Sequence, residues 1–88
     1  MLKRQTVAIE DVYVPVKRRQ ALDPNKVEAL AESILTKGQE APILVREDGT
    51  RFVLVEGLHR LEACRALGET TVSAISFRPG IIERPADR

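Results

Sequence analysis

Several residue types are scarce in this chain of 88 residues, and each shortage excludes a class of protein. The chain has one cysteine, Cys64, and one histidine, His59. A disulfide needs two cysteines and a structural zinc site needs about four Cys or His ligands, so we expect neither a disulfide framework nor a structural metal. Tryptophan is absent and aromatic residues make up 3% of the chain, which does not favour the aromatic stacking surfaces of single-strand nucleic-acid binders.

Long apolar runs and a strong charge of one sign are also missing. No stretch approaches the roughly 20 apolar residues that span a bilayer, and the N-terminus lacks the apolar run of a signal peptide. We therefore expect a cytoplasmic location and no membrane partner. Fourteen basic and thirteen acidic residues leave a net charge of +1 and a pI near 7.9, which does not favour tight, direct DNA binding. Any anion site must be local.

The length predicts one small domain. At this size folding buries only about 60 to 65% of the surface of the unfolded chain, so a second core would not fit and a ligand should lie in a surface cleft. We expect a single domain over residues 1–88, with a core over about 6–77 and a frayed tail over 78–88.

The hydrophobic pattern predicts an α+β domain with a mixed sheet and the order β-α-β-β-α-β. The basic stretch of residues 17–19 is interpreted as a solvated loop. Strands are expected at Thr6–Ile9, continuing as an extended segment to Val14, and at residues 43–45, 52–55 and 72–75, with a hairpin joining the second and third. Helices are expected over residues 24–37 and from Leu58 to Leu67.

The first helix has clear start and end signals. The Asp23 carboxylate can cap free N–H groups and the fixed φ of Pro24 suits the first helical position, while Gly38 suits the end. The apolar residues recur at helical spacing and should form one stripe that faces the core. This stripe contains Val27, Leu30, Ala31, Ile34 and Leu35.

The most informative segment is the turn from a strand into a helix at Gly57. Free backbone N–H groups and the helix dipole attract phosphate there, and a glycine lets an anion approach closely. His59 and Arg60 lie in the first turn, where a cation is disfavoured by up to about 1 kcal/mol. A polyanion would remove this penalty, because the guanidinium binds two oxygens and the imidazole donates a further hydrogen bond.

We therefore predict a phosphate site formed by Gly57, Leu58, His59 and Arg60. The alternative is that Gly57 only permits the turn and that His59 and Arg60 are ordinary surface residues.

Two carboxylates and one thiol lie close to this segment. Glu56 ends the strand and is a candidate Mg²⁺ ligand or general base; no other catalytic residue is assigned. Glu62, two residues after Arg60, should face elsewhere on the helix. Cys64 lies on the apolar side of the helix, so we interpret it as a small buried hydrophobe and not as a nucleophile.

The order of these motifs resembles the N-terminal domain of the ParB family and its sulfiredoxin-fold relatives. Leu30–Ile34, Gly38 and Pro42–Arg46 are similar to the family's helix, glycine and "Q-P-I-x-V-R" strand. Gly57–Ala63 lies where ParB proteins carry Gly-Glu-Arg-Arg-x-Arg-Ala. Within this box the glycine and the second arginine, Arg60, match the family. The chain departs from the pattern at Ala41, Leu58, His59 and Glu62.

The resemblance implies a nucleotide-binding module that acts as a switch in plasmid or chromosome partition or in related DNA-linked regulation. The implied cofactor is a nucleoside triphosphate, CTP or ATP, with Mg²⁺, held by residues 57–60 and supported by Pro42, Arg18 and Arg19. Its implied partners are DNA, bound weakly or through another protein, and a second copy of the chain. No helix-turn-helix is expected within these 88 residues.

Enzymatic alternatives remain open on the same fold. A weak NTPase is compatible with a switch. An ATP-dependent phosphotransferase resembling the free-serine kinases would use Glu56 or Glu10 to assist a hydroxyl group. A nuclease is less favoured because the sequence lacks the carboxylate cluster of two-metal cleavage. Sulfiredoxin activity is disfavoured because Leu58 stands where sulfiredoxins have cysteine. A non-catalytic interaction domain is the remaining alternative.

Overall fold

A computed structural model describes residues 2–38 and 41–79, which form a five-stranded mixed sheet and three α-helices. The predicted α+β class is confirmed. The predicted tail lies mostly outside the described residues. The elements are β1 (Lys3–Ala8), the 3-10 turn η1 (Ile9–Asp11), β2 (Val12–Tyr13), α1 (Val16–Arg19), α2 (Pro24–Lys37), β3 (Ile43–Asp48), β4 (Arg51–Glu56), α3 (Leu58–Ala66) and β5 (Thr71–Phe77).

The strands lie in the order β1-β5-β3-β4-β2, so β1 and β2 form opposite edges of the sheet. The sequence predicted one strand running into an extended segment; instead η1 separates two strands that pair at opposite edges. β2 pairs with β4 at only two positions, Val12 with Phe52 and Tyr13 with Val53. The outer edge of β4 after Val53 therefore has no strand neighbour within the described chain.

The basic stretch of residues 17–19 was predicted to be a loop, and this prediction is wrong. These residues belong to the short helix α1, which begins after Pro15. The carbonyl of Pro15 accepts hydrogen bonds from the N–H groups of Arg18 and Arg19 at 2.9 and 3.1 Å. Successive helical residues point about 100° apart, so Arg18 and Arg19 face different directions.

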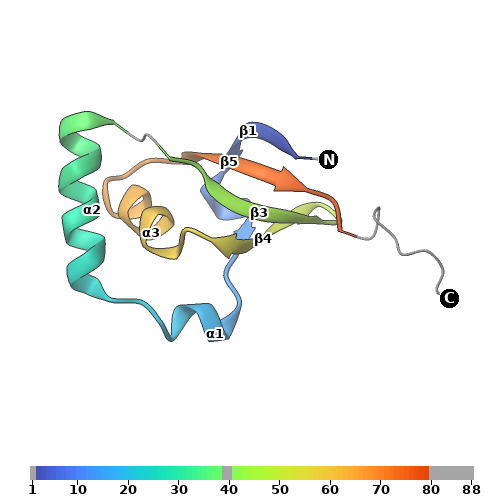
Figure 1. Cartoon of the computed structure of the whole chain (residues 1–88), viewed down its shortest axis with the longest axis horizontal. Helices are drawn as coiled ribbons and strands as arrows, with labels where there is room; N and C mark the ends of the chain where they lie inside the picture. The colour runs from blue at the N-terminus through green and yellow to red at the C-terminus, as the bar shows by residue number, and fades with distance from the viewer. Residues whose placement is uncertain (1, 39–40, 80–88) are drawn as a thin grey trace, which may run out of the picture.

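The two long helices lie in layers on one side of the sheet. Figure 1 shows α3 between the sheet and α2. Leu58, Leu61 and Cys64 of α3 are buried in the core with residues of the sheet such as Val45 and Leu54. No helix in residues 2–38 and 41–79 has the length and apolar character required to cross a bilayer.

Helix α2 forms the outer layer and contains no fully buried side chain. Four residues of its predicted apolar stripe are half-buried: Val27, Leu30, Ala31 and Ile34. The fifth, Leu35, is 73% exposed, which contradicts the prediction. Because α2 packs mainly on α3 and not on the sheet, the covered strip is too narrow to include a residue about 100° away from Ile34.

The hairpin of β3 and β4 leads directly into α3 and is distorted where it does so. Val45 pairs with Leu54, whereas Leu44 pairs with Glu56, so β4 carries one additional residue, Val55. Such a bulge bends the strand locally and often lies next to a functional site. The bend directs the chain out of the sheet and into the turn at Gly57.

The turn itself requires glycine for two reasons. Gly57 has φ of 107°, in the left-handed region that side chains disfavour. A Cβ atom at this position would lie 2.7 Å from Cγ2 and 2.9 Å from Cβ of Ile43. The start of α3 is therefore held against β3 at a distance that only glycine allows.

We predict that Gly57→Ala destabilises the fold more than Gly49→Ala. Gly49 also has positive φ, 64°, but faces open space, so alanine there costs only about 1 to 2 kcal/mol of backbone strain. At Gly57 the contact with Ile43 adds about 1 to 3 kcal/mol of overpacking. Thermal or urea unfolding of both variants measures the difference, and equal destabilisation would contradict the described packing.

Candidate phosphate-binding site

The N-terminus of α3 offers backbone N–H groups that no side chain caps. Gly57 is the N-cap residue, and its lack of a side chain leaves the first turn without a side-chain hydrogen bond. The first turn also contains no acidic residue. The positive end of the helix dipole therefore meets the Arg60 guanidinium, and the first turn contains no acidic side chain to balance it.

Leu58 and Arg60 occupy this turn in different ways. The side chain of Leu58 is 8% exposed and belongs to the core, so it can serve a ligand only through its backbone N–H. Arg60 is half-buried, less exposed than its place in a first turn predicts. Its positive charge acts to lower the pKa of the Cys64 thiol, one turn further along the helix.

Cys64 is confirmed as a buried residue, with 2% of its surface exposed. Burial is the main cause that raises the pKa of its thiol, and Glu69 raises it further, while Arg60 acts in the opposite direction. The net effect is a raised pKa, which disfavours the thiolate form that nucleophilic attack requires.

His59 is not an ordinary surface residue. It is half-buried, and its Nε2 atom accepts a hydrogen bond of 3.0 Å from the backbone N–H of Asp23. An accepting Nε2 has no proton, so the neutral ring carries its proton on Nδ1. Sequence reasoning missed this contact because the two residues are 36 positions apart.

The contact brings the N-termini of α2 and α3 together at one corner of the molecule (Figure 1). Asp23 is the N-cap of α2 and its Oδ1 accepts a hydrogen bond of 3.0 Å from the N–H of Asn25, as the sequence predicted. The first turn of α2 also lacks acidic residues, and Lys26 lies in it. Lys26 is not among the residues that the sequence predicted to bind a ligand, although it lies two residues after Pro24 in the first turn of the helix.

A cavity of about 520 Å³ lies between α1 and the outer edge of β4. No acidic residue lines it, and none of its three basic residues forms an ion pair with a described residue. Since Val55 lies two residues before Gly57, the cavity reaches within about 7 Å of the turn. Its lining residues are Pro15, Lys17, Arg18, Ala21, Arg46, Val53, Leu54 and Val55.

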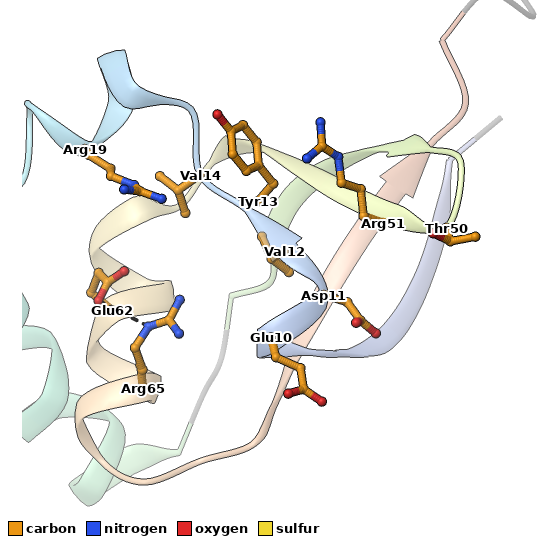
Figure 2. Close-up of a pocket in the computed structure, with 10 residues that line it drawn as sticks. All are labelled: Glu10, Asp11, Val12, Tyr13, Val14, Arg19, Thr50, Arg51, Glu62 and Arg65. Carbon is orange, nitrogen blue, oxygen red and sulfur yellow. Dashed lines mark ion pairs between the residues drawn. The ribbon is translucent and has the colours of Figure 1, made fainter.

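A second cavity, of about 560 Å³, lies along α3 and contains charges of both signs. Figure 2 shows Arg19 near Glu62 and Arg65 on one side, with Glu10 and Asp11 across the cavity. Oε1 of Glu62 and Nε of Arg65 form an ion pair at a distance of 3.4 Å. The structure therefore separates two residues that were predicted to act together, because Arg18 lines the first cavity and Arg19 the second.

The remaining predicted residues lie around the turn. Glu56 is exposed at the end of β4, and Pro42 is half-buried directly before Ile43, the residue that Gly57 contacts. Among residues 2–38 and 41–79, no group of three or more His, Cys, Asp or Glu side chains is arranged to hold a metal ion.

Comparison with known proteins gives a consistent result. The family model described as the ParB N-terminal domain matches residues 2–83. The probable chromosome-partitioning protein ParB of Campylobacter jejuni is 33% identical over 75 residues, which cover 82% of this chain and 27% of that protein. The crystal structure of sulfiredoxin from Arabidopsis thaliana has a TM-score of 0.76 and 31% identity, and the match covers 84% of this chain and 83% of that one.

A second similar structure is the C-terminally truncated chromosome-partitioning protein ParB from Caulobacter crescentus complexed with CTP-gamma-S. It has a TM-score of 0.72 and 27% identity, and the match covers 97% of this chain and 46% of that chain. The matched part of this chain spans 19 to 27% of the length of the curated ParB relatives. The family match over nearly the whole sequence shows that the chain belongs to the ParB N-terminal domain family.

Proposed function

We propose that this domain binds a nucleoside triphosphate at the N-terminus of α3 and that the bound nucleotide acts as a switch in DNA-linked regulation such as plasmid or chromosome partition. One observation carries the proposal: an uncapped first turn without acidic residues holds the Arg60 guanidinium, with the neutral His59 beside it. A helix that served only stability would carry acidic residues there. The similar Caulobacter structure, complexed with CTP-gamma-S, supports a nucleotide as the ligand.

The phosphates would occupy the corner where α2 and α3 begin. Backbone N–H groups of Leu58, His59 and Arg60 supply donors, and the Arg60 guanidinium can bind two phosphate oxygens. Lys26, in the first turn of α2, adds a positive charge on the other side of the corner. These groups suit a ligand with several negative charges better than a single carboxylate.

The ribose and base would extend into the cavity between α1 and β4. Its volume of about 520 Å³ lies within the roughly 300 to 1,000 Å³ of typical ligand sites. Pro15, Ala21 and Val55 provide apolar surface, and the outer edge of β4 after Val53 offers backbone donors and acceptors to a base. Lys17, Arg18 and Arg46 keep the cavity positive.

Mg²⁺ would bind with the nucleotide and not before it. Mg²⁺ prefers oxygen ligands, keeps several waters and is commonly held by one or two carboxylates together with phosphate oxygens. Glu56 is the carboxylate next to the turn and is exposed. Within this proposal Glu56 is the protein ligand, and the triphosphate and water supply the others.

A sulfur-based reaction is not supported by this geometry. Leu58, at the position that the sulfiredoxin resemblance assigns to cysteine, points into the core. Cys64 is buried and the pKa of its thiol is raised. DNA contact and self-association, which the resemblance implies, would then be the outputs of the nucleotide switch.

We predict that Arg60→Ala abolishes nucleotide binding while Arg65→Ala preserves it. Both variants remove one positive charge from α3, but Arg65 lies in the last turn and pairs with Glu62. CTP, ATP and GTP are each titrated with Mg²⁺ while the melting temperature is followed. A ligand concentration of 100 times the Kd stabilises the wild type by about 2.7 kcal/mol. For a domain of this size, each kcal/mol raises the melting temperature by about 4 to 8 °C.

A retained shift in Arg60→Ala would contradict the site, and an equal loss in Arg65→Ala would reveal a general charge effect. Loss of folding in Arg60→Ala would show that this half-buried residue is structural. Analysis of the nucleotide after incubation with DNA or with serine then separates a switch or weak NTPase from a phosphotransferase.

We further predict that Glu56→Gln weakens nucleotide binding in Mg²⁺ but not in EDTA. Without the metal, the Glu56 carboxylate repels the phosphates, so its removal leaves binding unchanged or tighter. With the metal, the variant loses a ligand and the benefit of adding Mg²⁺ shrinks. Isothermal titration under both conditions measures this difference. Equal Mg²⁺ dependence in variant and wild type would exclude Glu56 as a ligand.

A further inference from the structure

One long-range hydrogen bond joins the proposed phosphate turn to the start of α2. The Asp23 N–H donates to Nε2 of His59 at 3.0 Å. The other polar groups of Asp23 serve the helix: its carbonyl accepts from the N–H groups of Lys26 and Val27, and Oδ1 accepts from Asn25. His59 therefore holds the residue from which the first turn of α2 is built.

This hydrogen bond acts on a weakly packed part of the molecule. Neither α1 nor α2 contains a fully buried side chain, and Leu22, next to Asp23, is 40% exposed. Segments with few buried contacts open at low free-energy cost. A single partly buried hydrogen bond can therefore shift the order of the α2 N-terminus noticeably.

The two nitrogens of the imidazole ring allow His59 to contact Asp23 and a bound phosphate at the same time. Nε2 accepts from Asp23, so the ring has Nδ1–H as its remaining donor. A phosphate oxygen that accepts from Nδ1–H polarises the ring and increases the electron density on Nε2, which strengthens the bond to Asp23. Carboxylates act on metal-bound histidines in this way, through the second ring nitrogen.

We propose that His59 is a positioning residue that couples phosphate bound at the α3 N-terminus to the order of the first turn of α2. The inference rests on the proposed function and adds a route by which the ligand acts on the first turn of α2 and on Lys26. Coupling is reciprocal, so a more ordered α2 N-terminus also strengthens phosphate binding.

Histidine is essential to this coupling because the side chain must accept as well as donate. Arginine, which the ParB pattern has at this place, carries donors only and cannot accept from the Asp23 N–H. Glutamine carries one acceptor and one donor group. His59→Arg and His59→Gln therefore form a matched pair, because the first keeps a phosphate-binding cation without the acceptor and the second keeps the acceptor.

The test is amide hydrogen exchange at residues 23 and 25–27, with and without saturating Mg-CTP, Mg-ATP or inorganic tripolyphosphate. In the wild type we expect the best-binding probe to slow exchange of these amides by up to about twofold, because polarisation strengthens an existing hydrogen bond by only about 10 to 30%. His59→Gln should keep most of this slowing. His59→Arg should bind the same probe without slowing exchange at Asp23. Amides 33–37, at the other end of α2, serve as the internal control.

Each outcome decides the matter. Equal ligand-induced slowing in His59→Arg and in the wild type overturns the coupling, as does its loss in His59→Gln. Binding to the wild type without slowing at residues 23 and 25–27 overturns the coupling and leaves the proposed function intact. Failure of all three probes to bind the wild type overturns both. His59→Ala, which removes the acceptor without added bulk, replaces His59→Arg if that variant does not fold.

Discussion

The contact between Gly57 and Ile43 is the constraint on which the site depends. A left-handed residue without a side chain allows β4 to turn directly against β3 and start α3 there. The bulge that places Val55 outside the regular pairing directs the chain into this turn. The position of the α3 N-terminus, and with it His59 and Arg60, follows from packing in the core.

The two helices that begin at this corner differ in how their N-terminal N–H groups are capped. The N-terminus of α2 is capped by the side chain of Asp23, whereas α3 has no side-chain cap and carries Arg60 where an acidic residue would be more stable. Under the proposed function, a bound polyanion would compensate the positive charge at the start of α3. The structure also connects the two helix N-termini through the hydrogen bond from the Asp23 N–H to His59.

Sequence reasoning succeeded where the signal is local. The period of the apolar residues and the Asp-Pro cap predicted α2, and glycine after a buried strand predicted the start of α3. Sequence reasoning failed where the structure depends on contacts between segments that are distant in the sequence. The pairing of Val12 and Tyr13 with the far edge of the sheet, the exposure of Leu35 and the bond between His59 and Asp23 all depend on which elements meet in space. Arg18 and Arg19 diverge because α1 is helical, which three consecutive basic residues do not reveal.

The proposed phosphate site is tested most directly by a backbone amide NMR titration with inorganic tripolyphosphate, which carries the charge of the nucleotide without its base. We expect the largest proton shifts, downfield in direction, at Leu58, His59 and Arg60, and we expect them to saturate together below millimolar concentration. Unchanged amides at these three residues, with shifts confined to Lys17, Arg18 and other exposed basic residues, would contradict it.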